Sequence, residues 1–165
     1  MNFLIEDFNI SANAKRADRH LSRLRDHFIK QIDGAVPTSG FAINKTVFVC
    51  EHYKKNVDLV VSGEHFIEFK SISSSFKKNF NNRVEEMVGQ CQLLGSFGKV
   101  SYVFVYYDKE KGFARYGPLK GMIQRLVSQG LLYSAVLLKV DEESAIEDPD
   151  LDMVSFLKRM RAENE

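Results

Sequence analysis

The sequence is poor in the residues that interrupt or cross-link chains. Its 165 residues include three prolines, ten glycines, two cysteines and no tryptophan. So little proline and glycine excludes a collagenous or low-complexity chain, and 44% hydrophobic against 27% charged residues excludes a disordered one. Two cysteines exclude a disulfide scaffold. Because Cys50 and Cys91 lie in apolar stretches without metal-ligand spacing, we expect both to be buried free thiols.

Long hydrophobic runs are absent as well. No stretch reaches the roughly 18 consecutive apolar residues of a membrane-spanning helix. The acidic pair Glu6-Asp7 stands where a secretory signal peptide has a basic segment followed by an apolar one, so we expect a cytoplasmic protein. The length favours a single domain over 1–165, with its main part at about 11–107 and a C-terminal strand and helices at 118–161.

The net charge of +1 conceals a segregation of charge along the chain. Residues 11–31 carry six Lys or Arg against two Asp, residues 70–83 carry four bases and no acid, and residues 141–152 carry seven acids and no base. Separated basic and acidic surfaces are typical of a protein that binds a polyanion such as DNA. Ordinary solvated faces give the same pattern, so both interpretations stay open here.

The spacing of apolar residues predicts an amphipathic helix over 11–32, capped by Ser11 and ended at Gly34. At about 100° per residue, five of its basic residues, His27 among them, fall on one side of the helix. Phosphate contact needs such a basic ridge, although many solvated helices have one too. The ridge residues expected to contact DNA are Arg16, Arg19, Arg23 and Lys30.

The following elements predict an α/β fold. Three short strands are expected at 46–52, 57–61 and 65–71, joined by turns at 54–56 and 62–64 as an antiparallel meander. A polar loop at 72–82 leads to a helix at 82–94, and the later elements are a strand at 102–107, a helix from Pro118, a strand at 133–140 and a helix at 151–161. This order predicts a mixed central sheet flanked by helices.

Three charged residues lie within otherwise apolar strands. Because side chains alternate along a strand, Asp58 is expected on one face with Val60, and Glu68 on one face with Lys70. Buried charges need partners, and two carboxylates with the backbone carbonyl of Phe69 offer the oxygen ligands that suit Mg²⁺, with Mn²⁺ as a substitute. Lys70 would then orient or deprotonate a water molecule beside the metal. A structural ion pair between Glu68 and Lys70 is the alternative.

An Asp followed ten residues later by Glu-x-Lys resembles the motif of the PD-(D/E)xK nucleases. The segments 67–71 (IEFKS) and 75–86 (SFKKNFNNRVEE) further resemble a stretch of the XhoI-type restriction endonucleases. The resemblance implies that Asp58 and Glu68 bind the metal, that Lys70 is the catalytic lysine, and that the segment 79–83 approaches DNA. The chain departs from that family in its Lys77-Lys78 pair and in its shorter length.

The segment 76–83 combines neutral amides, which can read base edges, with cations, which contact phosphates. The residues expected to contact DNA there are Lys77, Lys78, Asn79, Asn81, Asn82 and Arg83. Three further residues are candidate accessory groups: Glu51 on the first strand, and Glu86 and Gln90 on the helix after the loop. An ordinary polar helix shoulder explains Glu86 and Gln90 equally well.

Together these features predict a Mg²⁺-dependent endonuclease that hydrolyses phosphodiester bonds of double-stranded DNA. A homodimer is expected of an enzyme that cuts both strands of a two-fold site. Two alternatives stay open: a structure-selective nuclease such as a junction resolvase, and a catalytically inactive DNA-binding module of the same fold.

Overall fold

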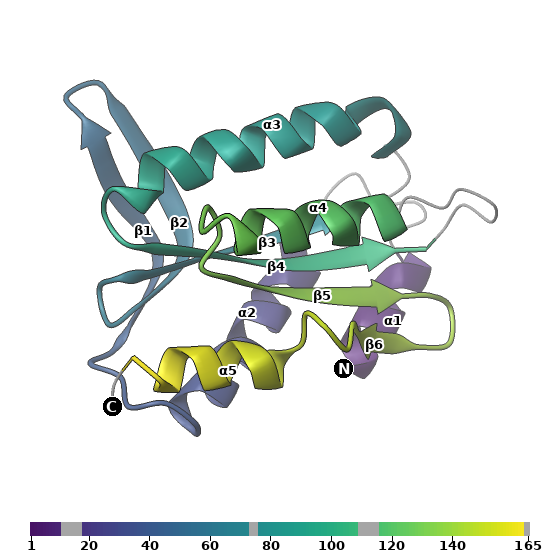
Figure 1. The fold of residues 1–165 in the computed structure, drawn as a ribbon. Coiled ribbons are helices and arrows are strands. Elements are labelled where there is room, and N and C mark those ends of the chain that lie inside the picture. Colours follow the sequence, from purple (N-terminus) through teal and green to yellow (C-terminus); the bar gives the residue numbers. More distant parts are fainter. Residues whose placement is uncertain (11–17, 73–75, 109–115, 164–165) are drawn as a thin grey trace.

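The computed structural model describes residues 1–10, 18–72, 76–108 and 116–163, which form helices packed on both faces of a sheet (Figure 1). The helices are α1 (Asn2–Ile10), α2 (Asp18–Asp33), α3 (Phe76–Gly95), α4 (Tyr116–Ser128) and α5 (Met153–Arg161). The strands are β1 (Phe41–Cys50), β2 (Tyr53–Val61), β3 (His65–Ile72), β4 (Lys99–Tyr107), β5 (Ser134–Val140) and β6 (Ala145–Glu147).

The six strands form one mixed sheet in the order β1-β2-β3-β4-β5-β6. Antiparallel pairing joins β1 to β2, β2 to β3 and β5 to β6, whereas β3, β4 and β5 run parallel. The two parallel connections pass through α3 and α4, which cover the same face of the sheet (Figure 1). Two successive crossovers of the same hand place their helices in this way.

Two apolar cores lie on the two faces of the sheet. The core on one face joins α1, α2 and α5 to the sheet through residues such as Leu4, Phe28 and Phe156. The core on the other face joins α3 and α4 to the sheet through residues such as Leu94 and Ile123. Strands β4 and β5 are buried almost throughout, which explains their nearly continuous apolar sequences.

Strand β2 loses one of its two partners along its length, and this loss shapes the candidate site. It pairs with β1 from Val61 back to Tyr53, but it pairs with β3 at only three positions, from Val61 back to Leu59. Beyond Leu59 the hairpin of β1 and β2 leaves the sheet and projects from the body, whereas β3 continues beside β4 (Figure 1). A fork between β2 and β3 therefore opens at Asp58.

Most of the predicted order of elements is confirmed, and the tight turn at Ser62-Gly63, where both residues have positive φ, joins β2 to β3 as expected. Several boundaries were wrong. Helix α1 and strand β6 were not predicted. Helix α3 begins at Phe76, so residues 76–82 of the loop expected at 72–82 have helical backbone. Residues 11–17, which were expected to begin the first helix, lie outside the described residues.

The first hairpin also turns earlier in the chain than predicted. Residues 54–56 continue strand β2, and the chain reverses at Glu51 and His52 instead. The expectation that Glu51 lies on the first strand was therefore wrong. Cys50 is exposed rather than buried, because it lies at the end of the projecting hairpin, whereas Cys91 is buried as expected. None of the described helices is long and apolar enough to cross a membrane.

Candidate metal and catalytic site

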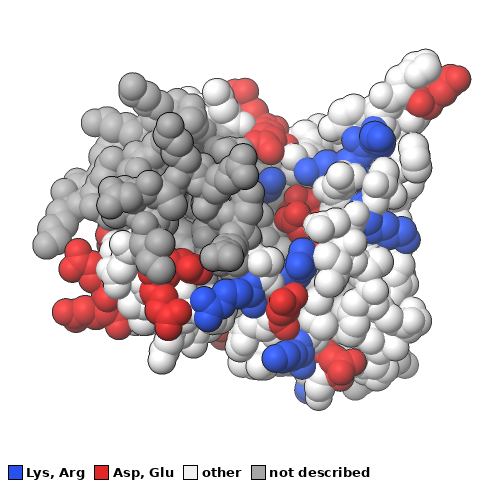
Figure 2. Space-filling view, turned by 180° about the vertical axis from the view of Figure 1, so that it is seen from behind, with Lys and Arg blue, Asp and Glu red and all other residues white. Residues whose placement is uncertain are grey.

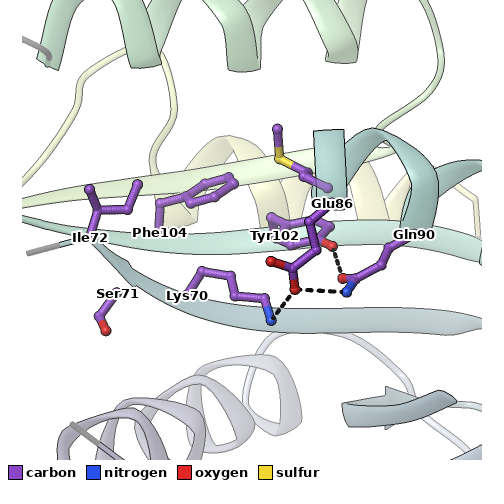
Figure 3. Close-up of a pocket in the computed structure, with 8 residues that line it drawn as sticks. Lys70, Ser71, Ile72, Glu86, Gln90, Tyr102 and Phe104 are labelled. Carbon is purple, nitrogen blue, oxygen red and sulfur yellow. Dashed lines mark hydrogen bonds and ion pairs between the residues drawn. The ribbon is translucent and has the colours of Figure 1, made fainter. Parts of the chain in front are cut away.

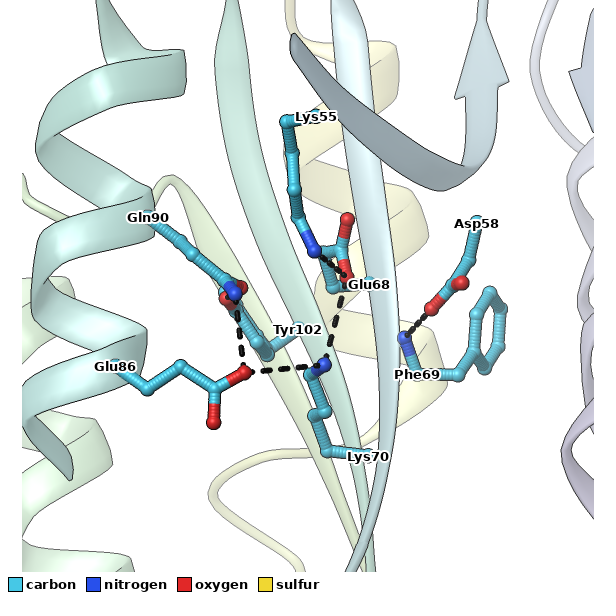
Figure 4. Close-up of polar contacts among 8 residues, drawn as sticks. All are labelled: Lys55, Asp58, Glu68, Phe69, Lys70, Glu86, Gln90 and Tyr102. Carbon is cyan, nitrogen blue, oxygen red and sulfur yellow. Dashed lines mark hydrogen bonds and ion pairs between the residues drawn. The ribbon is translucent and has the colours of Figure 1, made fainter. Parts of the chain in front are cut away.

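The fork between β2 and β3 brings the backbone of one strand to the side chain of the other. Past Leu59 the two strands no longer pair, and the backbone N–H of Phe69 donates to Oδ2 of Asp58 at 2.9 Å instead (Figure 4). The β1–β2 register also omits the pair Asn44 and Asp58, and Asn44 has a φ of +51°, which asparagine tolerates better than most residues. The local distortion of β2 thus places Asp58 at the mouth of the fork.

Glu68 lies deepest in the fork, with only 1% of its side chain exposed. The ammonium groups of Lys55 and Lys70 approach the same carboxylate oxygen, Oε2, at 3.6 and 3.8 Å (Figure 4). The other oxygen, Oε1, is buried and has no hydrogen-bond partner among the described residues. A carboxylate with one oxygen left without a partner is costly inside a protein, so this oxygen favours a ligand that the described residues do not supply.

The surroundings of Glu68 disfavour its ionised form. Burial, together with the nearby charge of Asp58, raises the pKa of Glu68 to about 7, although Lys55 and Lys70 act in the opposite direction. The two lysines therefore offset only part of the cost of burying this carboxylate. A bound cation would offset the rest, because it favours the ionised carboxylate.

Lys70 is held from the opposite side by a chain of polar contacts that starts in the core. Tyr102 donates to Gln90 at 2.6 Å, Gln90 donates to Glu86 at 3.1 Å, and Glu86 lies 3.8 Å from the ammonium of Lys70 (Figure 3). These residues line a small pocket of about 30 Å³ between α3, β3 and β4. The contacts orient Lys70 toward the fork and keep its charge paired.

This arrangement predicts that Tyr102 stabilises the fold through its hydroxyl. Tyr102 is fully buried, so Tyr102→Phe leaves the acceptor oxygen of Gln90 without its partner. We expect the free energy of unfolding to fall by about 1–2 kcal/mol, measured by urea denaturation. Tyr53→Phe, at a half-exposed tyrosine of the hairpin, is the matched control and should change it little. Equal stability of the two variants would contradict this role of the hydroxyl.

An open cavity of about 530 Å³ lies on the other side of β3, between α2 and the first strands. Its lining consists of Leu21, Ser22, Arg25, Asn44, Asp58, Phe69 and Lys70. Asp58 thus faces α2, whereas Val60 packs in the core under α3 and α4. The expectation that these two residues share a face was wrong, because the distortion at Asn44 and the end of the β2–β3 pairing interrupt the alternation of β2.

The structure brings most of the predicted catalytic group together. Asp58 contacts the backbone of Phe69 on the side of β3 that faces α2. Glu68 and Lys70 pair on the other side of the strand, where Glu86 and Gln90 approach Lys70 from α3 (Figure 4). Glu51 does not join them, because it lies in the turn of the hairpin, about 20 Å along the strand from Asp58. Among the described residues, no group of three or more His, Cys, Asp or Glu could hold a metal ion.

The predicted DNA contacts are only partly placed. Asn81 and Asn82 are exposed on α3, and Lys30 is exposed on α2. Arg23 contacts α1, where it lies 3.5 Å from Glu6 and over the ring of Phe3. For the remaining predicted contacts, the structure describes either no part of the residue or no side chain: Arg16, Arg19, Lys77, Lys78, Asn79 and Arg83.

Two residues of the site were missed in the sequence. Lys55 was assigned to a turn, so its place opposite Glu68 was not considered. Arg25 was not considered, because it is not part of the predicted basic ridge, yet it lines the cavity with Asp58. A charged residue within the apolar arc of an amphipathic helix was the signal that pointed to Arg25.

No protein-family model, curated protein or solved structure matches this chain. The assignment of a function therefore depends on the chemistry of the fork itself.

Proposed function

We propose that this protein is a metal-dependent nuclease that hydrolyses phosphodiester bonds of DNA, with a site of the PD-(D/E)xK type. The observation that carries the proposal is the buried oxygen Oε1 of Glu68, which has no hydrogen-bond partner among the described residues and lies in a fork that also holds Asp58. A divalent cation with a preference for oxygen ligands would satisfy it.

A purely structural ion pair explains this arrangement less well. Both lysines lie near Oε2, at 3.6 and 3.8 Å, and no described residue donates a hydrogen bond to Oε1. A structural pair would be expected to satisfy both oxygens, since a half-satisfied buried carboxylate destabilises the fold. The donor set therefore fits a cation better than it fits a closed salt bridge.

Asp58 and Glu68, with the carbonyl of Phe69 as the predicted third ligand, would hold Mg²⁺ or Mn²⁺. When bound, such a cation lowers the pKa of a coordinated water and offsets charge on the phosphoryl oxygens. The ammonium of Lys70 lies beside Glu68, so it would orient the attacking water or offset charge that develops on the phosphate. Glu86 keeps Lys70 in that position.

The choice of DNA as substrate comes from the proposed chemistry and the sequence resemblance to XhoI-type enzymes. Seen from behind, Lys and Arg are interspersed with Asp and Glu across the middle of this face and do not gather in one basic patch (Figure 2). Recognition would then depend on cations placed in the cavity and along the substrate path. A homodimer and a cytoplasmic location belong to the same proposal, and a junction resolvase or an inactive DNA-binding module are its alternatives.

Incubation of the purified protein with supercoiled plasmid tests the proposal. We expect nicked and linear products with Mg²⁺ or Mn²⁺ and none with EDTA, because the carboxylates act only through a bound cation. A parallel incubation with a four-way DNA junction distinguishes a resolvase, which prefers the branched substrate. If the protein binds DNA but cleaves it in none of these incubations, the inactive module is favoured and the proposal is contradicted.

A further inference from the structure

Arg25 is a cation that the fold places in the cavity without a strong partner. Its side chain is only 18% exposed, and its Nε is buried with no hydrogen-bond partner among the described residues. The ion-pair contact of Nε is with Asp26, the next residue in the chain, at 3.7 Å, which is too long for a hydrogen bond. Arg25 shares the cavity lining with Asp58 and Lys70.

The position of Arg25 on α2 is unusual for a charged residue. At about 100° per residue, Arg25 lies beside the buried residues Phe28 and Ile32, and about 160° away from the predicted basic ridge. A cation on the apolar side of a helix loses hydration, and the fold is expected to tolerate it only where an anion or a polar ligand can approach. The cavity offers the space for such a ligand.

The charges around the cavity indicate which ligand this is. Asp58 and Glu68 repel a phosphate, so cations are needed on the same side to hold one near them. Arg25 brings a cation to the cavity from α2, whereas Lys70, which also lines the cavity, has its ammonium paired with Glu68 and Glu86. A guanidinium suits this task, because its planar fork donates two parallel hydrogen bonds to phosphate oxygens.

We propose that Arg25 binds a phosphodiester group of the DNA backbone in the cavity beside Asp58. This inference depends on the proposed function for the identity of the substrate. It adds a binding residue on α2 to the groups from β2 and β3, and it assigns the cavity as the path of the DNA strand. The competing explanation is that Arg25 only packs its aliphatic stem against the core.

Affinity for a short DNA duplex in buffer with Ca²⁺, titrated over a range of salt concentrations, tests this contact. We expect Arg25→Ala to weaken binding about tenfold and to reduce the slope of log affinity against log salt by about 0.9, the value for one lost phosphate contact. Arg25→Lys should bind with intermediate affinity, since it keeps the charge but loses the fork. Arg125→Ala removes an equal charge from an exposed position on α4, on the other face of the sheet, and should change binding less than twofold.

An Arg25→Ala variant with the affinity and salt slope of Arg125→Ala would overturn the inference and make Arg25 a packing residue. If Arg25→Ala fails to fold, the comparison of Arg25→Lys and Arg25→Gln decides in its place. If the wild type and Arg25→Ala cleave DNA at the same rate, the inference is rejected and the nuclease proposal stays intact. Binding that depends on Arg25, without cleavage, would reject the nuclease and support the contact. A wild type that binds no duplex overturns both.

Discussion

Replacing Asp58 or Glu68 by alanine is expected to abolish Mg²⁺-dependent cleavage of plasmid DNA. Each variant removes one of the two carboxylates at the fork, so we expect the cleavage rate to fall on the order of 10³-fold or more. Titration calorimetry with Mg²⁺ should show a loss of metal binding in both variants. Glu142→Ala, at an exposed carboxylate remote from the fork, is the control and should keep full activity.

The two lysines provide a sharper comparison, because both approach the same oxygen of Glu68. Only Lys70 also lines the cavity with Asp58. Lys70→Ala should therefore abolish cleavage while metal binding persists, whereas Lys55→Ala should lower the rate by only about tenfold. Equal losses in the two variants would show that the lysines act only on the charge of Glu68. Full activity of Lys70→Ala would reject the proposed role of Lys70.

How much of this site could be predicted depends on how local each feature is. The pattern Asp58, Glu68 and Lys70 lies on two consecutive strands, and a tight turn joins them, so the sequence alone predicted their proximity. The face of the sheet to which each side chain points was not predictable in the same way. The alternation of β2 is interrupted where it leaves β3, and that interruption arises from tertiary pairing rather than from the residues of β2 themselves.

The errors in the first hairpin have a similar cause. Lys54, Lys55 and Asn56 are polar and typical of a turn, yet they extend β2 because β1 pairs with them along a projecting ribbon. Because the turn was misplaced, Lys55 was missed, and Glu51 was assigned to the strand instead of to the turn. Helix α1 was missed because its buried residues Leu4 and Phe8 give too short a periodic pattern.

The charge of Glu68 is also expected to have a large effect on stability. Removing this charge should lower activity but raise the stability of the folded protein. The pKa of Glu68 rises from 4.5 to about 7 in the folded protein, because burial disfavours the carboxylate. The folded state therefore binds this proton more tightly than the unfolded state does. The contribution of Glu68 to the free energy of unfolding is complete below pH 4.5 and is lost as the pH rises through 7.

At pH 8 without divalent cations, the ionised Glu68 should thus destabilise the protein by about 3 kcal/mol. Glu68→Gln keeps the shape of the side chain and removes the charge, so we expect it to raise the melting temperature by about 5–10 °C in EDTA at pH 8. At pH 4 the gain should vanish, because wild-type Glu68 is then protonated. Glu142→Gln, at an exposed position, should show no such dependence on pH.

Mg²⁺ at pH 8 should reduce this difference, because it binds and stabilises the wild type but not a variant that lacks the charged ligand. Differential scanning calorimetry of both proteins, with EDTA and with Mg²⁺, measures the two effects together. A structural ion pair predicts the reverse result in EDTA: Glu68→Gln would be less stable than the wild type, since Lys55 and Lys70 would lose their counter-charge. That outcome would contradict the assignment of Glu68 as a metal ligand, and a gain in EDTA that Mg²⁺ reverses would support it.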